Sequence, residues 1–144
     1  MSQENVELTR RALEDFRAGK SEFDANGALV KLAGEDHMHP DVEFDASESL
    51  APDLRGVFHG KDEVRRWWGE WLAAWETVEF EYELRDAGDS VVALLDQRMR
   101  GRSTGIEVPR GKYAQVATYR DGLMVHWRFY RSQEQALEAV GLRE

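Results

Sequence analysis

Alternation of apolar and polar positions is clearest in the last third of the chain, where two β-rich runs follow each other. Residues 113–119 and 123–130 are rich in aromatic and β-branched side chains, and a short segment ending in Gly122 separates them. A glycine-containing gap of this length between two such runs predicts a β-hairpin. Ser132 and Gln135 follow at the spacing of a capping box, which predicts that a helix begins here.

The segment 78–84 alternates strictly between apolar and acidic residues, as expected for a strand with one buried and one wet face. The apolar positions are Val78, Phe80, Tyr82 and Leu84, and the acidic positions are Glu79, Glu81 and Glu83. A turn at Gly88 and Asp89 leads into a second strand over residues 91–100. Together with the terminal hairpin, these segments predict an antiparallel sheet of long strands.

Helical spacing dominates the part of the chain before residue 78. Residues 4–18 carry one apolar side, and residues 61–77 form the strongest predicted helix. The wide apolar face of that helix consists of Val64, Trp67, Trp68, Trp71, Leu72 and Trp75. Ser21 and Asp24 can start another helix. This second helix would bury Ala28, Leu29, Leu32 and Ala33. Two short strands are expected at residues 42–45 and 55–58.

This order of elements indicates one α+β domain over residues 1–144. Strands gathered in the second half of a chain pack against helices that precede them. We therefore expect a curved antiparallel sheet wrapped around the N-terminal helices and the Trp-rich helix. The concavity between helices and sheet would form a pocket.

Composition narrows the classes of partner. The net charge of −9 argues against nucleic acid or an anionic membrane as the main partner, because phosphate contacts require clustered cations. The chain has no cysteine, so disulfides, thiolate metal sites and cysteine nucleophiles are excluded. His37 and His39 lack a third metal ligand at an evident spacing, and we expect neither metal nor cofactor. No apolar run reaches membrane-spanning length and the N-terminus lacks a signal peptide, so a cytoplasmic location is expected.

Several segments resemble the SnoaL-like branch of the nuclear transport factor 2-like superfamily. They are the opening helix at 1–16, the run His39-Pro40-Asp41-Val42-Glu43-Phe44, the run Phe58-His59-Gly60-Lys61-Asp62-Glu63-Val64, and the segments 101–108, 120–122 and 134–142. The resemblance implies a cone-shaped α+β barrel with an internal pocket, often dimeric through the outer sheet face. Relatives include polyketide cyclases, ketosteroid isomerase, limonene epoxide hydrolase, dehydratases and non-catalytic binding or association domains, so the fold does not fix an activity.

Asp45 is the first catalytic candidate. Its position at the end of the short strand resembles that of the general-base aspartate of ketosteroid isomerase, and a carboxylate among Trp side chains would have a raised pKa. Gln97 and Tyr113 would act as polarising donors. Alternatively, Asp45 only caps backbone N–H groups. Ketosteroid isomerase itself is disfavoured, because Ala12 stands where its first helix has a Tyr and the strand 112–119 carries no acid.

Asp96 and Arg98 form a second candidate pair, because residues two apart share one strand face. The pair resembles the acid and arginine of the epoxide hydrolase, but that chemistry requires a second acid, and none is evident on the neighbouring strand. We favour an alternative in which both side chains lie on the outer face in cross-strand charge pairs with the glutamates of 78–84. Leu95, Gln97 and Met99 then face inward.

The last strand has two possible registers. If Val125, Trp127 and Phe129 face the pocket, His126 and Tyr130 face outward; in the reverse register these two become an acid/base pair. We favour the first register because it buries Trp127 and Phe129 together. Trp67 and Trp71 are expected to form the pocket wall. Further ligand contacts are expected from Phe16, Tyr82, Leu95, Met99, Gln115, Trp127 and Phe129.

The sequence thus predicts a pocket protein that binds a small, largely apolar molecule. Two functions remain open. The pocket either carries out cofactor-free acid/base chemistry, such as cyclisation, isomerisation, dehydration or epoxide hydrolysis, or it belongs to a non-catalytic binding or dimerising association module. We expect a homodimer formed through the outer sheet face.

Overall fold

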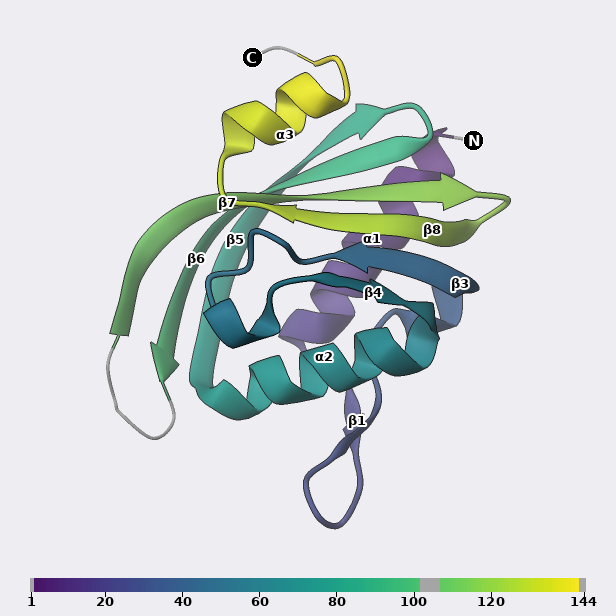
Figure 1. Ribbon diagram of the computed structural model, residues 1–144. Coiled ribbons are helices and arrows are strands. Elements are labelled where there is room, and N and C mark those ends of the chain that lie inside the picture. Colours follow the sequence, from purple (N-terminus) through teal and green to yellow (C-terminus); the bar gives the residue numbers. More distant parts are fainter. Residues whose placement is uncertain (1, 102–106, 143–144) are drawn as a thin grey trace.

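The computed structural model describes residues 2–101 and 107–142 and shows an α+β arrangement (Figure 1). Residues 102–105 of the predicted glycine-rich connection lie outside this range. The elements in chain order are α1 (Ser2–Arg17), β1 (Glu22–Phe23), β2 (Leu29–Lys31), the 3-10 turn η1 (Glu35–His37), β3 (Met38–Asp45), the 3-10 turn η2 (Pro52–Leu54), β4 (Val57–His59), α2 (Gly60–Ala74), β5 (Trp75–Ala87), β6 (Ser90–Gly101), β7 (Glu107–Arg120), β8 (Leu123–Tyr130) and α3 (Gln133–Ala139).

The main sheet contains six strands in the order β4-β3-β8-β7-β6-β5. Strands β5 to β8 form an antiparallel meander, as the alternation in the sequence predicts. The expectation of a purely antiparallel sheet is wrong at one place, because β3 and β8 are parallel. The long stretch of chain between them includes α2, so no tight turn requires these two strands to be antiparallel. With β4 and β5 at its two edges, the sheet is open and does not close into a barrel.

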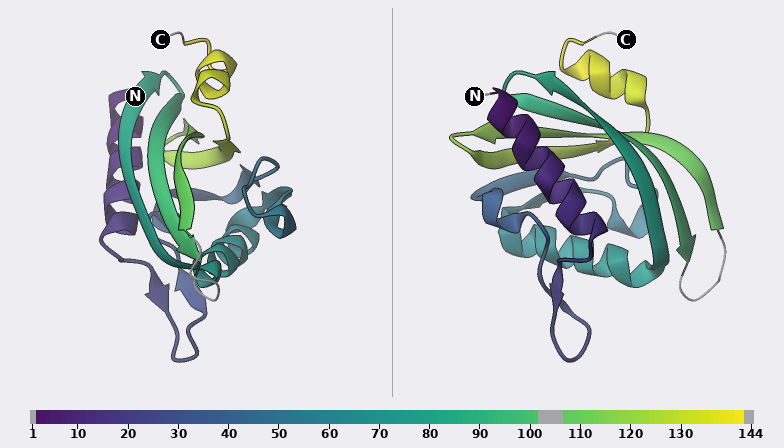
Figure 2. Two further views of the ribbon diagram at one scale, coloured as in Figure 1. Left: turned by 90° about the vertical axis from the view of Figure 1, so that its left-hand side faces the viewer. Right: turned by 180° about the vertical axis from the view of Figure 1, so that it is seen from behind.

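The two faces of the sheet are covered by different helices (Figures 1 and 2). Helices α1 and α2 lie on the concave face, where the larger hydrophobic core includes Phe44, Trp68 and Met99. Helix α3 packs on the opposite, outer face against a second cluster. That cluster comprises Val92, Leu94, Ala114, Val116, Tyr130, Ala136 and Leu137. The middle of β6 is therefore buried on both sides, which explains its continuous apolar run.

The predicted second helix is wrong. Residues 22–31 instead form the short β1–β2 hairpin, which projects away from the sheet (Figure 1). Asp24 Oδ1 accepts hydrogen bonds from the backbone N–H groups of Asn26 at 2.8 Å and Ala28 at 3.0 Å. A short acidic side chain that bonds its own backbone in this way favours a turn over a helix. Leu32 is nevertheless buried, so the expected burial is right although the element is not.

Other expectations are confirmed with changed boundaries. Helix α2 ends at Ala74, three residues earlier than predicted, because the chain from Trp75 onward pairs with β6 as strand β5. The hairpin β7–β8 turns through Asp121 and Gly122, which both have positive φ. Ser132 caps α3, since its Oγ accepts from the backbone N–H of Gln135 at 3.2 Å.

Candidate functional site

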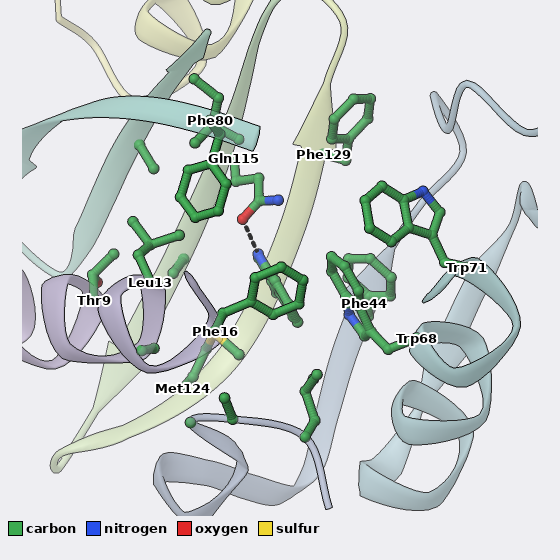
Figure 3. A pocket seen from close by; sticks show the side chains of 18 of the residues that line it. Thr9, Leu13, Phe16, Phe44, Trp68, Trp71, Phe80, Gln115, Met124 and Phe129 are labelled. Carbon is green, nitrogen blue, oxygen red and sulfur yellow. Dashed lines mark hydrogen bonds between the residues drawn. The ribbon is translucent and has the colours of Figure 1, made fainter. Parts of the chain in front are cut away.

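A pocket lies between the concave face of the sheet and helices α1 and α2 (Figure 3). Its cavity volume is about 120 Å³. Alternate residues of β6 reach into it, namely Leu95, Gln97 and Met99, as the sequence predicts. The pattern holds because successive strand residues point to opposite faces. Predicted contacts that line the pocket are Phe16, Trp67, Trp71, Leu95, Met99, Gln115, Trp127 and Phe129.

Aromatic side chains form one wall of the pocket. Trp68 of α2 stacks on Trp127 of β8, with ring centroids 5.3 Å apart and planes 14° from parallel. Phe44 of β3 touches both, with centroid distances of 6.1 Å to Trp68 and 4.7 Å to Trp127. Trp67 is fixed by a hydrogen bond from its Nε1 to the carbonyl oxygen of Leu54 at 2.6 Å. Such interlocked rings present a rigid apolar surface suited to flat ligands.

Few polar groups line the pocket, and most of them bond to one another. Gln115 Oε1 accepts from Trp127 Nε1 at 3.1 Å (Figure 3). The hydroxyl groups of Thr9 and Tyr119 are 2.8 Å apart. Burial raises the pKa of Tyr119, although the bond to Thr9 opposes the shift, so its phenol stays protonated at neutral pH. The remaining amide, that of Gln97, has only a weak 3.8 Å contact from its Nε2 to the sulfur of Met99.

No described residue that lines the pocket is an aspartate, glutamate, lysine or arginine. The one imidazole is that of His37, and this residue is exposed to solvent. The pocket interior is therefore uncharged at neutral pH. Acid/base chemistry needs a titratable group within hydrogen-bond reach of the ligand, and the described lining offers little beyond Tyr119 and His37.

The expected position of Asp45 inside the pocket is wrong. Its neighbour Phe44 lines the pocket, so Asp45 points to the outer face. There Oδ1 accepts from the backbone N–H of Ser47 at 3.0 Å and from its hydroxyl at 2.6 Å, and Oδ2 is 3.7 Å from Arg128 Nε. Partial burial alone would raise the pKa of Asp45, but the bonds from Ser47 and the charges of Arg128 and His126 outweigh it, and the net shift is downward. The raised pKa expected for a general base is therefore wrong as well.

Two predicted tyrosines lie outside the set of residues that line the pocket. Tyr113 packs on Phe129, with centroids 5.8 Å apart, and its ring lies over Gly111. The hydroxyl of Tyr82 donates to Glu14 of α1, and its ring lies 5.2 Å from the guanidinium carbon of Arg17. Both tyrosines lie on the concave face, opposite Leu95 in the register, but their side chains contact these protein partners and neither lines the cavity.

The second-choice catalytic residues lie on the outer face. His126 Nε2 is 3.2 Å from Glu43 Oε2, and the ring of Tyr130 lies in the cluster beneath α3. The register that buries Trp127 and Phe129 is thus the one present. Arg98 stands opposite Glu79 of β5 in the register, as expected for a charge pair. Asp96 stands opposite Glu81, which has the same charge, and opposite Lys112 of β7 on its other side. The structure does not bring these residues together with Gln97, the one predicted catalytic side chain that lines the pocket.

Sequence reasoning missed several lining residues. Phe80, Ala93 and Ala117 lie two residues from predicted contacts on the same strands, so strand alternation could have found them. Ser49 and Leu50 carry no such signal, because they belong to the loop between β3 and η2.

An arginine from a distant part of the chain holds this loop against the sheet. Arg131, just after β8, donates from Nε to the carbonyl oxygen of Glu48 at 2.8 Å and from Nη2 to that of Ser49 at 3.0 Å. Arg55 Nε reaches the Ser49 oxygen at 2.9 Å. Guanidinium groups that saturate loop carbonyls replace the hydrogen bonds a regular strand would supply. The loop therefore forms a defined part of the pocket wall.

Metal and membrane sites were also considered within residues 2–101 and 107–142. This part of the chain contains no group of three or more His, Cys, Asp or Glu side chains arranged to hold a metal ion. None of its helices has the length and apolarity to span a bilayer.

Comparison with solved structures supports the fold. An NTF2-like protein of unknown function from Burkholderia pseudomallei is 19% identical, with 96% of this chain and 98% of that chain covered and a TM-score of 0.71. TerC, co-crystallised with polyporic acid, is 18% identical, with 95% and 98% covered and a TM-score of 0.67. A protein with a ketosteroid isomerase-like fold from Catenulispora acidiphila, in complex with trimethylamine, is 17% identical, with 77% and 82% covered and a TM-score of 0.57.

Sequence comparison identifies the family. No curated protein matches the chain. The SnoaL-like domain, however, matches residues 10–127, which include the second half of α1, all of α2 and most of the sheet. With its NTF2-like architecture, the chain belongs to the SnoaL-like domain family.

Proposed function

We propose that this protein binds a small, flat, uncharged and largely apolar molecule in the pocket, and that the pocket binds it without catalysing a reaction. The observation that carries the proposal is the absence of any charged side chain among the described residues that line the cavity. An ionised ligand would lose its hydration there without gaining a counter-charge, which is costly. An apolar ligand would instead bury its surface against the tryptophan wall.

The size of the cavity limits the ligand. An engineered apolar cavity of about 150 Å³ is known to hold benzene. The cavity of about 120 Å³ here is of the same order, so it suits one aromatic ring or a small fused bicycle. The similarity to TerC and to the ketosteroid isomerase-like protein, both crystallised with small molecules, supports a ligand-binding use of this fold.

Catalysis is disfavoured by the positions of the titratable groups. The carboxyl group of Asp45 points away from the cavity and has a lowered pKa. The hydroxyl of Tyr119 is engaged with Thr9. A pocket that lacks a poised acid or base can hold and release a ligand but cannot shuttle its protons efficiently.

The test is a ligand titration followed by ¹H–¹⁵N NMR, read at the tryptophan indole N–H signals. We expect neutral one- and two-ring aromatic compounds to shift the signals of Trp68 and Trp127, whereas benzoate and benzylamine leave them unchanged. Ala93→Phe should abolish binding, because Ala93 lines the cavity and the larger side chain would fill it. Ala74→Phe, the same substitution at an exposed position of α2, serves as the matched control.

Three results would contradict the proposal. They are stronger binding of the charged compounds, unchanged binding by the Ala93→Phe variant with its fold intact, and turnover of a bound compound. Fold integrity is checked by the dispersion of the same spectra and by thermal melting.

A homodimer through the outer sheet face stays a prediction. Helix α3 covers the middle of that face, and one surface left for a second copy is formed by β3, β4 and part of β8. It includes the exposed Val57 and the side chains of Glu43, His59 and His126. Analytical ultracentrifugation of the protein and of a Val57→Glu variant would test it, with a monomer expected only for the variant.

A further inference from the structure

One amide in the pocket wall is held in a fixed orientation. An indole Nε1 can only donate a hydrogen bond, and that of Trp127 donates to Gln115 Oε1 at 3.1 Å. This bond uses one lone pair of the Gln115 oxygen and sets which way the amide is turned. The two residues lie on neighbouring strands, because β7 and β8 pair with Gln115 opposite Phe129. Figure 3 shows the oxygen of Gln115 turned toward the indole and its nitrogen turned away.

The donor itself cannot easily turn. The Trp127 ring is stacked on Trp68 at 5.3 Å and packs against Phe44 at 4.7 Å. Rotation of the indole would break both ring contacts in a dense aromatic cluster, which well-packed interiors resist. The pair Gln115–Trp127 is thus held in one arrangement, in which the amide Nε2–H₂ group points away from the indole.

The same wall offers hydrogen-bond donors without acceptors. No described residue accepts from Gln115 Nε2. Trp68, whose residue surface is 6% exposed, has its Nε1 buried with no partner among the described residues. A buried donor without an acceptor loses its hydrogen bonds to water and gains none within the protein, which costs free energy. The buried N–H of Trp68 therefore leaves a place for an acceptor that the described protein atoms do not supply, and Gln115, which also lines the pocket, offers a second donor.

We infer that the pocket selects flat carbonyl compounds, such as cyclic ketones, lactones or quinones, whose oxygen accepts from Gln115 Nε2–H₂ or Trp68 Nε1–H. This inference rests on the proposed binding function and adds the chemistry of the ligand. Trp127 is a positioning residue in this scheme, because it sets which end of the amide meets the ligand. A compound of the same shape without an acceptor leaves the donors unpaired.

A second amide lies farther along the pocket. Gln97 is four residues along β6 from Ala93, the strand partner of Gln115. At about 3.3 Å per residue the two positions are about 13 Å apart, so one small bicyclic molecule does not contact both. Among the described residues, no indole fixes the Gln97 amide, and the side-chain hydrogen bond found for it there is the weak contact to Met99. The predicted selectivity therefore belongs to Gln115 and Trp68 and not to Gln97.

Three bicyclic probes of nearly equal shape test the inference. Indene has no hydrogen-bonding group, 1-indanone has only an acceptor, and indole has only a donor. We expect 1-indanone to bind about fivefold more tightly than indene, as one neutral hydrogen bond allows, and indole to bind no better than indene. In ¹H–¹⁵N spectra, 1-indanone should also move the Gln115 amide or Trp68 indole signals in a way that indene does not.

Two variants separate the roles of the pair. Gln115→Met keeps the side-chain length and removes the amide, so the preference for 1-indanone over indene should fall to about onefold if Gln115 is the main donor. Trp127→Phe keeps an aromatic ring and frees the Gln115 amide to turn. The affinity for indole should therefore rise relative to the affinity for 1-indanone. A structural defect alone would weaken all three probes equally, which distinguishes lost packing from a lost preference.

The outcomes are distinguishable. If none of the three probes binds, the proposed function fails and the inference fails with it. If indene and 1-indanone bind equally well, the proposed function stands and the inference is overturned. The inference is also overturned if the preference survives Gln115→Met but disappears in Gln97→Met, because the selecting amide would then be the other one.

Discussion

The concave and outer faces of the sheet are made by the same strands but have opposite chemistry. On β6 the inward residues Leu95 and Met99 alternate with Asp96 and Arg98 outside. On β8 Trp127 faces the pocket, whereas His126 pairs with an acid on the outer surface. The comparison teaches that the titratable groups of this sheet lie mainly where they cannot reach a pocket ligand. The pocket is chemically neutral because strand alternation places the charges on the other side.

The strongest way to break this comparison is to place a charge on the concave face. Met99 is 1% exposed, and Met99→Glu would bury a carboxylate without a designed partner. We expect a loss of about 3–5 kcal/mol in the free energy of unfolding at pH 7, measured by urea denaturation. Burial would raise the pKa of the new carboxyl group, so part of the stability should return as the pH falls toward 5.

The reciprocal variant on the outer face is the control. Arg98→Met, one residue away on the exposed side of β6, should change the free energy of unfolding by no more than about 0.5 kcal/mol. Similar losses for Met99→Glu and Arg98→Met would show that the two faces are not as different as the packing indicates.

An intermediate effect is expected at the buried ion pair beside the pocket. Glu35 of η1 is 8% exposed. Its carboxylate accepts hydrogen bonds from the backbone N–H of Leu32 at 2.9 Å and from Nε of Arg65 at 3.0 Å. The bond to Arg65 joins η1 to α2. Burial alone would raise the pKa of Glu35, but the bonds from Arg65 and Leu32 outweigh it and lower the pKa. Glu35→Gln should cost about 2–3 kcal/mol at pH 7 because Arg65 loses its charged partner.

The stability that Glu35 contributes should depend on pH in a defined direction. A lowered pKa in the folded state contributes stability above the unfolded pKa of about 4.3, and that contribution is lost as the pH falls through the folded value. The difference in stability between wild type and Glu35→Gln should therefore shrink below about pH 4. A difference that stays constant from pH 7 to pH 3 would show that charge is not its source.

A smaller effect than that of Glu35→Gln is expected for Asp45→Asn on the outer face. The side chain is 17% exposed and bonded to Ser47, so its loss should cost at most about 1 kcal/mol at pH 7. The lowered pKa means that this contribution is present above about pH 4 and disappears in more acidic solution. Ligand affinity should be unchanged, because Asp45 does not line the pocket. A tenfold loss of ligand affinity in Asp45→Asn would show that Asp45 contributes to ligand binding.

The sequence predictions are accurate where the residues of one element alone determine its structure. Strict alternation over 78–84 and the pairing of Trp127 with Phe129 identify the inward faces of β5 and β8, because burial of one face fixes the register. The helix over 61–77 is found from its tryptophans, with only its end misplaced. The segment 21–33 fails because the side chain of Asp24 and its backbone bonds compete with helical spacing.

The candidate site could be predicted only in part. Asp45 was chosen from its place at a strand end in a resembling family, and a shift of one residue exchanges the two faces of a strand. Phe44 takes the inward position together with Val42, and the alternation of these apolar residues with Glu43 and Asp45 predicts an outward Asp45, against the family resemblance. Ser49 and Leu50 could not be found at all, since the contacts that bring their loop to the pocket come from Arg131.

The anchoring of that loop also sets an order of events during synthesis. The part of the pocket wall that includes Ser49 and Leu50 depends on Arg131. The strand that precedes this loop, β3, pairs with β8. A ribosome must therefore complete β8 before the pocket can close, although most of the aromatic residues are made earlier. Contacts so distant in sequence form late and slowly. A partly synthesised chain would expose its tryptophan surface to chaperones before it could bind a ligand.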